Sequence, residues 1–451
     1  TSRAALLPLG CESVAPQVLP GGQGTRHNVN SRDRKKSATE DRKSSAENTP
    51  PRGHLHTAHP RSACRVSRPQ ESLYQLLQQQ QHSRYVDHAA YFRSSSSRAL
   101  LMAANGVLDG SADAVSRDGE LSWMVNKFGG TSVASAEAMQ VVQDIIMGQV
   151  TTRGDGGKMA VVVSAMGGKP KVTDLLLNSV SLAAKGDRVG SETLLSKIRA
   201  KHDRAIAQLG LSQEDGDRIK SVVESDLSDI RVLHKAVSLM RHEDGKIREL
   251  VSGFGELWSS QVLCALLNQN AEGRRFCYLD ARRVLIVADR PEEEAMSVSP
   301  GPEIDWESSA AKLKEFLASE EALACPSGIV ITGYVASTKD GVATTLRRDG
   351  SDYSASIFGK LLQASAVQIW TDVDGVLSAD PRKVPEAKVL PEVSFNEAME
   401  LAYFGAKVIH PKTMQPAVAA GVPIFIRNTF NPDFPGTRIF TTSTATKDRR
   451  R

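Results

Sequence analysis

From residue 123 onward, short apolar segments alternate with longer amphipathic ones, and this alternation constrains the fold more than any other feature of the sequence. Strand-length segments that are each followed by a helix-length segment are typical of an α/β domain with a largely parallel sheet. The pattern predicts strands at 123–127, 159–164, 274–278, 328–333, 368–371 and 422–427. It predicts helices at 135–147, 171–184, 257–269, 306–318, 353–362 and 396–403, and a polar helical pair within 192–241.

The first hundred residues differ in composition from the rest of the 451-residue chain. They hold 15 Lys and Arg against 7 Asp and Glu, which leaves 41 basic and 45 acidic residues in the remainder. The net charge of +4 is therefore no argument for nucleic-acid binding by the folded part. Residues 1–115 show no sustained apolar period, and we expect them to form a disordered basic leader. Their Arg- and Ser-rich composition is that of an organelle transit peptide, and a disordered tail without a targeting role is the alternative.

Cysteine usage and hydropathy disfavour further classes of protein. The five cysteines include no CxxC pair and are odd in number, which argues against a disulfide scaffold and against a Cys-based zinc site. No uncharged apolar run reaches the roughly 18 residues that a membrane helix needs. The sequence thus predicts neither a membrane nor a nucleic-acid partner.

The segment KFGGTS at 127–132 follows a predicted strand and precedes a predicted helix. Gly129 and Gly130 would let backbone N–H groups approach an anion, the helix N-terminus adds a favourable dipole, and Lys127 supplies a cation. A Gly-Gly turn can also be a purely geometric requirement, because glycine tolerates positive φ. The flanking lysine and hydroxyl groups favour phosphate binding, although the chain contains neither a GxxxxGK[ST] nor a GxGxxG motif.

Two other turns at predicted strand and helix ends contain glycine. VSAMGG at 163–168 runs from a strand into small residues at the edge of the predicted sheet. RRDGSDY at 347–353 places two arginines beside a glycine turn, with Ser351 or Asp352 as the expected helix cap. Guanidinium groups bind carboxylates or phosphates bidentately, and a capped, solvated turn is the alternative.

The segment TDVDG at 371–375 places acidic residues directly after a buried-looking strand. Asp372 and Asp374 offer oxygen ligands for Mg²⁺, but an Asx-type turn without metal is as common for this pattern. We therefore assign no metal ligand to the chain.

Together these turns resemble the motifs of aspartate kinase, a member of the amino acid kinase family. The matching segments are KFGGTS at 127–132, VSGFGEL at 251–257, TLRRDGSD at 345–352, TDVDGVLSADPR at 371–382, FGAKVIHP at 404–411 and NTFNPDFPGTRI at 428–439. They keep the family's order over roughly 123–441, and their wording is most similar to the kinase half of plant-type bifunctional aspartate kinase–homoserine dehydrogenases.

The resemblance implies a fold and a location. The fold is a three-layer αβα sandwich with a mainly parallel central sheet, formed by residues 121–441 and followed by a disordered basic tail at 442–451. The location is the plastid stroma if the leader is a transit peptide, and the cytoplasm otherwise.

The resemblance also implies transfer of the ATP γ-phosphate to the side-chain carboxylate of L-aspartate, the first step of lysine, threonine and methionine biosynthesis. Mg²⁺ is expected on the phosphates, held largely by ATP and water. The acceptor carboxylate is already ionised, so it needs no general base, and catalysis must come from positioning and charge neutralisation. The implied catalytic residues are Lys127, Lys407 and Asp352.

Further contacts follow from the same resemblance. The implied nucleotide contacts are Lys127, Phe128, Gly129, Gly130, Thr371, Asp372, Leu377, Arg382, Lys407 and Val408. The implied substrate contacts are Thr131, Ser132, Ser164, Thr173, Glu256, Arg348, Gly350 and Ser351. Among these, Arg348 would bind the α-carboxylate of L-aspartate and Glu256 its ammonium group.

Each charged residue also has a structural explanation. Lys127 could be a solvated lysine at a strand end, Arg348 a surface ion-pair partner, and Glu256 an acid that stabilises a helix N-terminus. Two other functions also stay open: an amino acid kinase with another acyl acceptor, and a truncated, non-catalytic relative that binds ATP or aspartate.

The end of the sequence leads to one more expectation. Family members normally continue into ACT regulatory domains, whereas this sequence stops shortly after Ile439. We therefore expect insensitivity to lysine and threonine, and a homodimer weakened by the lack of ACT surfaces.

Overall fold

The computed structural model describes residues 122–154, 157–269, 273–288, 302–347, 349–403 and 411–441. The predicted leader and the predicted basic tail both lie outside these residues, so their disorder stays a prediction. The helices and strands of the described part follow one another along the chain in the alternation that the sequence predicts.

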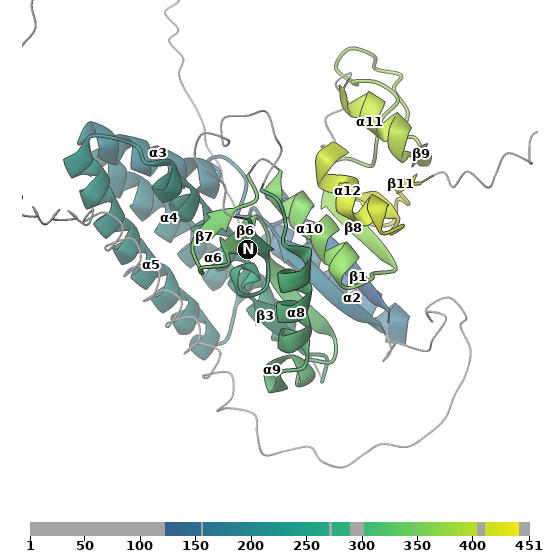
Figure 1. The fold of residues 1–451 in the computed structure, drawn as a ribbon, viewed down its shortest axis with the longest axis horizontal. Helices are drawn as coiled ribbons and strands as arrows, with labels where there is room; N and C mark the ends of the chain where they lie inside the picture. Colours follow the sequence, from purple (N-terminus) through teal and green to yellow (C-terminus); the bar gives the residue numbers. More distant parts are fainter. Residues whose placement is uncertain are drawn as a thin grey trace, which may run out of the picture. The chain divides into compact units, whose positions relative to one another are not determined.

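An eight-stranded sheet forms the centre of the fold (Figure 1), in the order β3-β5-β2-β1-β8-β10-β11-β9. Its strands are β1 (Trp123–Phe128), β2 (Lys158–Val163), β3 (Phe276–Leu279), β5 (Gly328–Thr332), β8 (Ala366–Thr371), β9 (Glu392–Ser394), β10 (Ile424–Asn428) and β11 (Thr437–Phe440). Neighbouring strands pair in parallel except β10 and β11. The predicted α/β fold with a mainly parallel sheet is thus confirmed.

Helices cover both faces of this sheet. On one face, Gln149 of α2 (Ala136–Arg153) donates to Gln368 at 2.8 Å and accepts from Asn126 at 2.9 Å. Asn126 and Gln368 are register partners in β1 and β8, so their side chains point to the same face. On the other face, a Cβ at Gly359 of α10 (Gly350–Leu361) would lie 2.5 Å from Val367 Cγ2. The sheet is therefore the middle of three layers, and its buried strands are almost continuously apolar.

The helix α6 (Gly245–Asn268) is a core helix that begins well before the predicted start at 257. It is long and apolar enough to cross a membrane by length and composition alone, but the apolar window is entirely buried inside the protein. Its N-terminus is capped by Asp244, whose side chain accepts from the backbone N–H groups of Lys246 and Ile247. Burial on all sides explains why its apolar residues show no single stripe.

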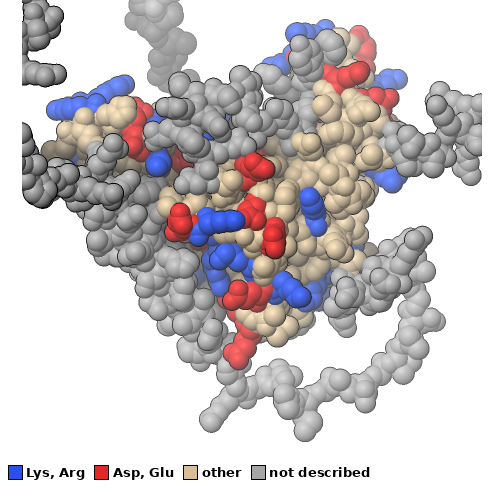
Figure 2. Space-filling model, viewed as in Figure 1, with Lys and Arg blue, Asp and Glu red and all other residues tan. Residues whose placement is uncertain are grey.

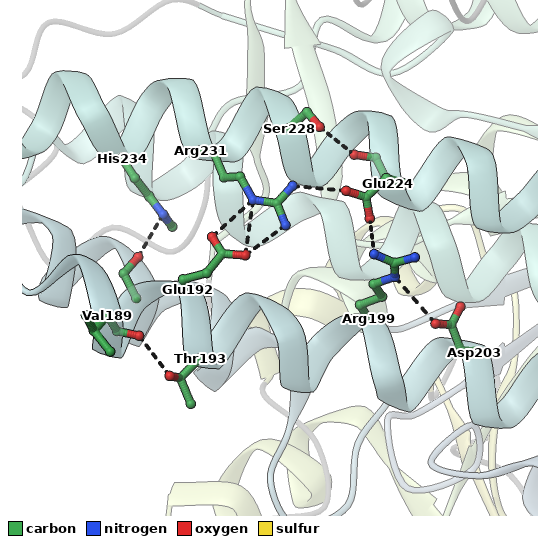
Figure 3. Close-up of polar contacts among 10 residues, drawn as sticks. Val189, Glu192, Thr193, Arg199, Asp203, Glu224, Ser228, Arg231 and His234 are labelled. Carbon is green, nitrogen blue, oxygen red and sulfur yellow. Dashed lines mark hydrogen bonds and ion pairs between the residues drawn. The ribbon is translucent and has the colours of Figure 1, made fainter.

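Three helices beside the sheet form a bundle: α3 (Val172–Lys185), α4 (Arg188–Leu209) and α5 (Gln213–Met240). The last two are the predicted polar helical pair, and ion pairs connect them (Figure 3). Arg231 of α5 pairs with Glu192 of α4 at 2.9 Å and with Glu224 at 3.1 Å, and Glu224 pairs with Arg199 of α4 at 2.9 Å. These four residues define the α4–α5 network.

A small second sheet and several short elements complete the described part. The sheet consists of β4 (Ile286–Val287), β6 (Val335–Thr338) and β7 (Ala343–Thr345). The remaining elements are η2 (Ala281–Arg283), α8 (Trp306–Leu317), α9 (Glu320–Leu323), α11 (Phe395–Tyr403) and α12 (Pro411–Ala419). On the face in Figure 2, acidic and basic side chains are interspersed around α8 rather than separated by sign.

Candidate active site

The carboxyl ends of the central parallel strands meet at one edge of the sheet. The chain passes from β1 to β2 on one side, while β8 lies on the other side of β1, so the strand order changes direction at β1. Ligands of open α/β sheets bind at such a switch point, outside the carboxyl ends of the strands. The turns after β1, β2 and β8 are the ones that the sequence singled out, and we call this edge the crevice.

Two glycine turns interlock at the crevice. The backbone N–H of Gly129 donates to Trp370 O at 3.2 Å, which ties the turn after β1 to β8. The N–H of Gly167, in the turn after β2, donates to Gly130 O at 2.8 Å. A Cβ at Gly167 would lie 2.4 Å from the carbonyl carbon of Gly130, so this close backbone approach requires glycine.

Lys127 is buried near the end of β1, on the face of the sheet that α10 covers. Its Nζ lies 2.6 Å from Asp352 Oδ1, and the two side chains are 10% and 16% exposed. The predicted helix caps are wrong, because the cap of α10 is Asp349 in the left-handed conformation, which places Ser351 and Asp352 inside the first turn. Asp352 can therefore pair with Lys127 instead of capping the helix.

Glu256 lies in the middle of α6 and is buried at 5% exposure. Burial raises the pKa of its carboxyl group to about 8, although the backbone N–H of Ala165 and the charge of Lys127 both favour the ionised form. Among the residues that the structure describes, its Oε2 has no hydrogen-bond partner. A Cβ at Gly255 would lie 2.7 Å from Ala165 Cβ, so glycine allows α6 to approach the turn after β2 this closely.

The position of Glu256 excludes its structural explanation, and its burial indicates which groups the crevice can bind. Glu256 is not an acid at a helix N-terminus, because α6 begins at Gly245. A buried carboxylate with an unpaired oxygen is costly, and a bound cation or proton removes that cost. The crevice thus brings together a lysine and glycine turns suited to phosphate, and a carboxylate suited to an ammonium group.

Two of the predicted contacts lie beneath the turn rather than on its surface. The Ser132 side chain is fully buried, and its hydroxyl oxygen lies 2.7 Å from that of Thr429 at the end of β10. Phe128 is fully buried and stacks on Trp370 with ring centroids 5.9 Å apart. Both side chains thus support the turn from the core.

The remaining predicted substrate contacts lie around the crevice. Ser164 follows β2, and its carbonyl accepts from Ser259 of α6 at 2.7 Å. Ser351 lies against the backbone at the end of β5, where a Cβ at Gly333 would be 2.7 Å from its hydroxyl oxygen. Thr131 is exposed in the first glycine turn, and Thr173 is partly buried in the first turn of α3.

The loop after β8 is fixed to the end of β10. Asp374 Oδ1 accepts from the side-chain amides of Asn428 at 2.7 Å and Asn431 at 3.1 Å. Asp372 is exposed, and its carboxylate accepts from the Thr371 hydroxyl at 3.2 Å. Asp374 thus acts as the centre of a polar turn.

Further along the same loop, Leu377 forms an isolated bridge with Val389. The exposed Arg382 pairs with Asp380 at 2.8 Å. Across the described ranges, no group of three or more His, Cys, Asp or Glu residues is placed to hold a metal ion.

Three of the predicted site residues lie outside the described part of the chain. Arg348, Lys407 and Val408 are not among the described residues, so their roles stay predictions.

One residue near the site was not predicted from the sequence. The ammonium group of Lys201 in α4 donates to the carbonyls of Gly167 and Pro170 in the turn after β2. No sequence signal identifies it, because it belongs to a polar helix with many similar side chains.

Comparison with known proteins settles the family. A profile of the amino acid kinase family matches residues 122–428. The chain belongs to the amino acid kinase family. Among similar members, the chloroplastic bifunctional aspartokinase/homoserine dehydrogenase 1 of Zea mays is 39% identical over 318 residues, which cover 70% of this chain and 32% of that protein. The chloroplastic aspartokinase 2 of Arabidopsis thaliana is 34% identical over 325 residues, which cover 70% of this chain and 54% of that protein.

The fold of this chain is also similar to that of a solved aspartokinase. The crystal structure of E. coli aspartokinase III in complex with aspartate and ADP matches with a TM-score of 0.60 at 31% identity, covering 71% of this chain and 65% of that one. The chain therefore spans about a third of the length of the bifunctional relative and about two thirds of this structural neighbour.

Proposed function

We propose that the chain is an aspartate kinase, which transfers the γ-phosphate of ATP to the side-chain carboxylate of L-aspartate to give 4-phospho-L-aspartate and ADP. One observation carries the proposal: Lys127 and Glu256 lie at the same crevice, close enough for the lysine charge to influence the carboxyl group. Within the described part of the chain, Glu256 Oε2 has no hydrogen-bond partner. The similarity to aspartokinases, one of them in complex with aspartate and ADP, supports this choice.

In this proposal Lys127 stabilises charge on the transferred phosphoryl group, and Asp352 keeps its ammonium group in place. Gly129 N–H donates to Trp370 O, and other backbone N–H groups of the glycine turn would donate to phosphate oxygens. Lys407 would add a second cation, and Thr371, Asp372, Leu377, Arg382 and Val408 would contact the nucleotide. Mg²⁺ would enter as part of the nucleotide complex, held by phosphates and water.

At the acceptor end, Glu256 would bind the ammonium group of L-aspartate and Arg348 its α-carboxylate, with Ser164, Thr173 and Ser351 as polar neighbours. These contacts orient the side-chain carboxylate toward the phosphoryl group. Because that carboxylate is already ionised, the protein contributes positioning and charge neutralisation rather than a proton acceptor.

The test is an acceptor screen with the purified 451-residue chain, Mg·ATP and hydroxylamine, which traps acyl phosphates as hydroxamates. We expect product with L-aspartate, and none with N-acetyl-L-aspartate, which lacks the ammonium group that Glu256 would bind. Product with L-glutamate but not with L-aspartate would identify a kinase with another acceptor. Absence of product with every acceptor would favour the non-catalytic relative.

We also propose that the enzyme acts in plastids, at the first step of lysine, threonine and methionine biosynthesis. The names of the plant relatives include "chloroplastic", and the leader has the composition of a transit peptide. A fluorescent fusion of residues 1–115 with an initiating methionine should enter plastids. Purely cytosolic fluorescence would contradict this location.

A further inference from the structure

We propose that Lys201 is a positioning residue for the kinase reaction: from α4 it holds the turn after β2 in the conformation that forms the acceptor end of the crevice. The inference rests on the proposed function, and it concerns a residue that is not among the proposed substrate contacts.

The ammonium group of Lys201 joins two points of one turn. It donates to Gly167 O and, at 3.0 Å, to Pro170 O. Both carbonyls belong to residues 164–170, which carry no helix or strand of their own. Within this turn Gly168 has φ +85°, a conformation that only glycine adopts at low cost. A single cation with several N–H donors thus holds a segment that regular secondary structure does not stabilise.

The same turn makes contacts on its other side that form the site. Gly167 N–H donates to Gly130 O at 2.8 Å, which places the turn against the proposed phosphate-binding glycines. Ala165 N–H donates to the carboxyl group of Glu256, and Val172 N–H donates to Met166 O at 3.0 Å at the start of α3. A movement of this turn would therefore shift the hydrogen bond that orients Glu256.

These contacts give Lys201 a role that differs from its neighbours on α4. Arg199, two residues earlier, pairs with Glu224 across the exposed α4–α5 network and makes its contacts within the helical bundle. Lys201 instead reaches the crevice, where its Nζ lies 3.5 Å from the position of a Cβ on Gly168. Hydrogen bonds from a charged donor are stronger than neutral ones, so loss of this donor loosens the turn more than loss of a surface lysine.

The test compares Lys201→Met, Lys201→Arg and Lys197→Met. The first keeps the aliphatic stem and removes the donors, the second keeps the charge and donors, and the third removes an exposed lysine one turn earlier on the same helix. We would measure melting temperature, kcat, KM for L-aspartate and for ATP, and amide hydrogen exchange of peptides covering 164–170.

For Lys201→Met we expect a rise of about tenfold in KM for L-aspartate and less than a twofold change in KM for ATP. We also expect faster exchange in 164–170 and unchanged exchange on α4. Lys201→Arg should have a KM for L-aspartate close to that of the unmodified chain. Lys197→Met should behave like the unmodified chain in every measurement. Unchanged exchange in 164–170 would show that Lys201 does not hold the turn in place. Faster exchange with an unchanged KM for L-aspartate would overturn its positioning role.

The exchange measurement needs no catalytic activity, so it remains decisive if the unmodified chain forms no acyl phosphate. That result would contradict the proposed function, but not the inference that Lys201 holds the turn in place.

Discussion

The α4–α5 network and the crevice both contain charged side chains, but these side chains differ in their exposure and in how they are paired. In the network, Arg231, Glu192, Glu224 and Arg199 are paired with one another, and their side chains are 35–54% exposed. In the crevice, Lys127 and Asp352 are 10% and 16% exposed. Among the described residues Glu256 Oε2 has no hydrogen-bond partner, and the same is true of Glu224 Oε2 in the network, but that oxygen is paired with Arg199.

This difference separates structural charges from functional ones. Exposed ion pairs are screened by water and contribute little, so a chain can carry many of them without consequence. A buried charge that is incompletely paired is costly, and such groups occur mainly where a ligand or a reaction uses them. We therefore expect substitutions in the crevice to change activity and substitutions in the network to have almost no effect.

The largest effect should come from Lys127→Met, which removes the charge and keeps the stem. Loss of a group that stabilises developing charge typically costs about 10²–10³ in kcat. The matched control is Lys158→Met, at the opposite end of the parallel strand β2. Initial rates of hydroxamate formation would be measured for both. If kcat of Lys127→Met stayed within threefold of the unmodified chain, the proposed role of the crevice lysine would be wrong.

Glu256→Gln should mainly weaken the use of L-aspartate. A hydrogen bond to a charged group contributes about 1.5–3 kcal/mol, so KM for L-aspartate should rise roughly 10- to 100-fold while KM for ATP hardly changes. Arg348→Ala tests the same end of the site, because Arg348 is predicted to bind the α-carboxylate of L-aspartate. Steady-state kinetics with each substrate varied in turn would check this, and a loss of ATP affinity alone would refute the division of the crevice into two ends.

Glu256 should also make folding stability depend on pH. Its folded-state pKa of about 8 lies above the ordinary value of 4.5, so between these values the folded chain binds more protons than the unfolded chain. Stability must then fall as pH rises through this window. Melting temperatures of the unmodified chain and of Glu256→Gln should diverge from pH 5 to pH 8, with the variant gaining. Parallel curves would show that Glu256 is not protonated in the folded state.

The smallest effect should come from Arg231→Met in the network. Exposed pairs contribute about 0.2–1 kcal/mol, so the free energy of unfolding should change by no more than about 1 kcal/mol, with kcat and both KM values unchanged. Urea unfolding and the hydroxamate assay would measure these quantities. A tenfold loss of activity would remove the distinction between the two regions.

The sequence predicted the strands of the central sheet well, because buried parallel strands are continuous apolar runs with glycine-containing turns at their ends. It placed the start of α6 at 257 instead of Gly245, since Gly253 and Gly255 resemble a turn when read without neighbours. In the fold, these glycines let the helix pack closely, with would-be Cβ atoms 2.7 Å from Val335 and from Ala165.

The same limit applies to the site. Residues next to glycine turns were identified as candidates, but their burial could not be predicted, and Ser132 and Phe128 proved to face the core. The short strands β9, at one edge of the central sheet, and β11, next to it, were missed because they are too short for a periodic signal. The small sheet of β4, β6 and β7 was missed for the same reason. Lys201 was missed because its partners are backbone carbonyls far away in the sequence.

The most direct test of the functional charge in the crevice is the number of protons released when L-aspartate binds. Glu256, with a pKa of about 8, is mostly protonated at pH 7, and an ammonium group bound beside it favours the ionised form. Titration calorimetry at pH 7 in buffers of different ionisation enthalpy should show release of about one proton per L-aspartate in the unmodified chain, and none in Glu256→Gln. Binding without proton release in the unmodified chain, or equal release in both, would contradict the assignment of Glu256 to the acceptor ammonium group.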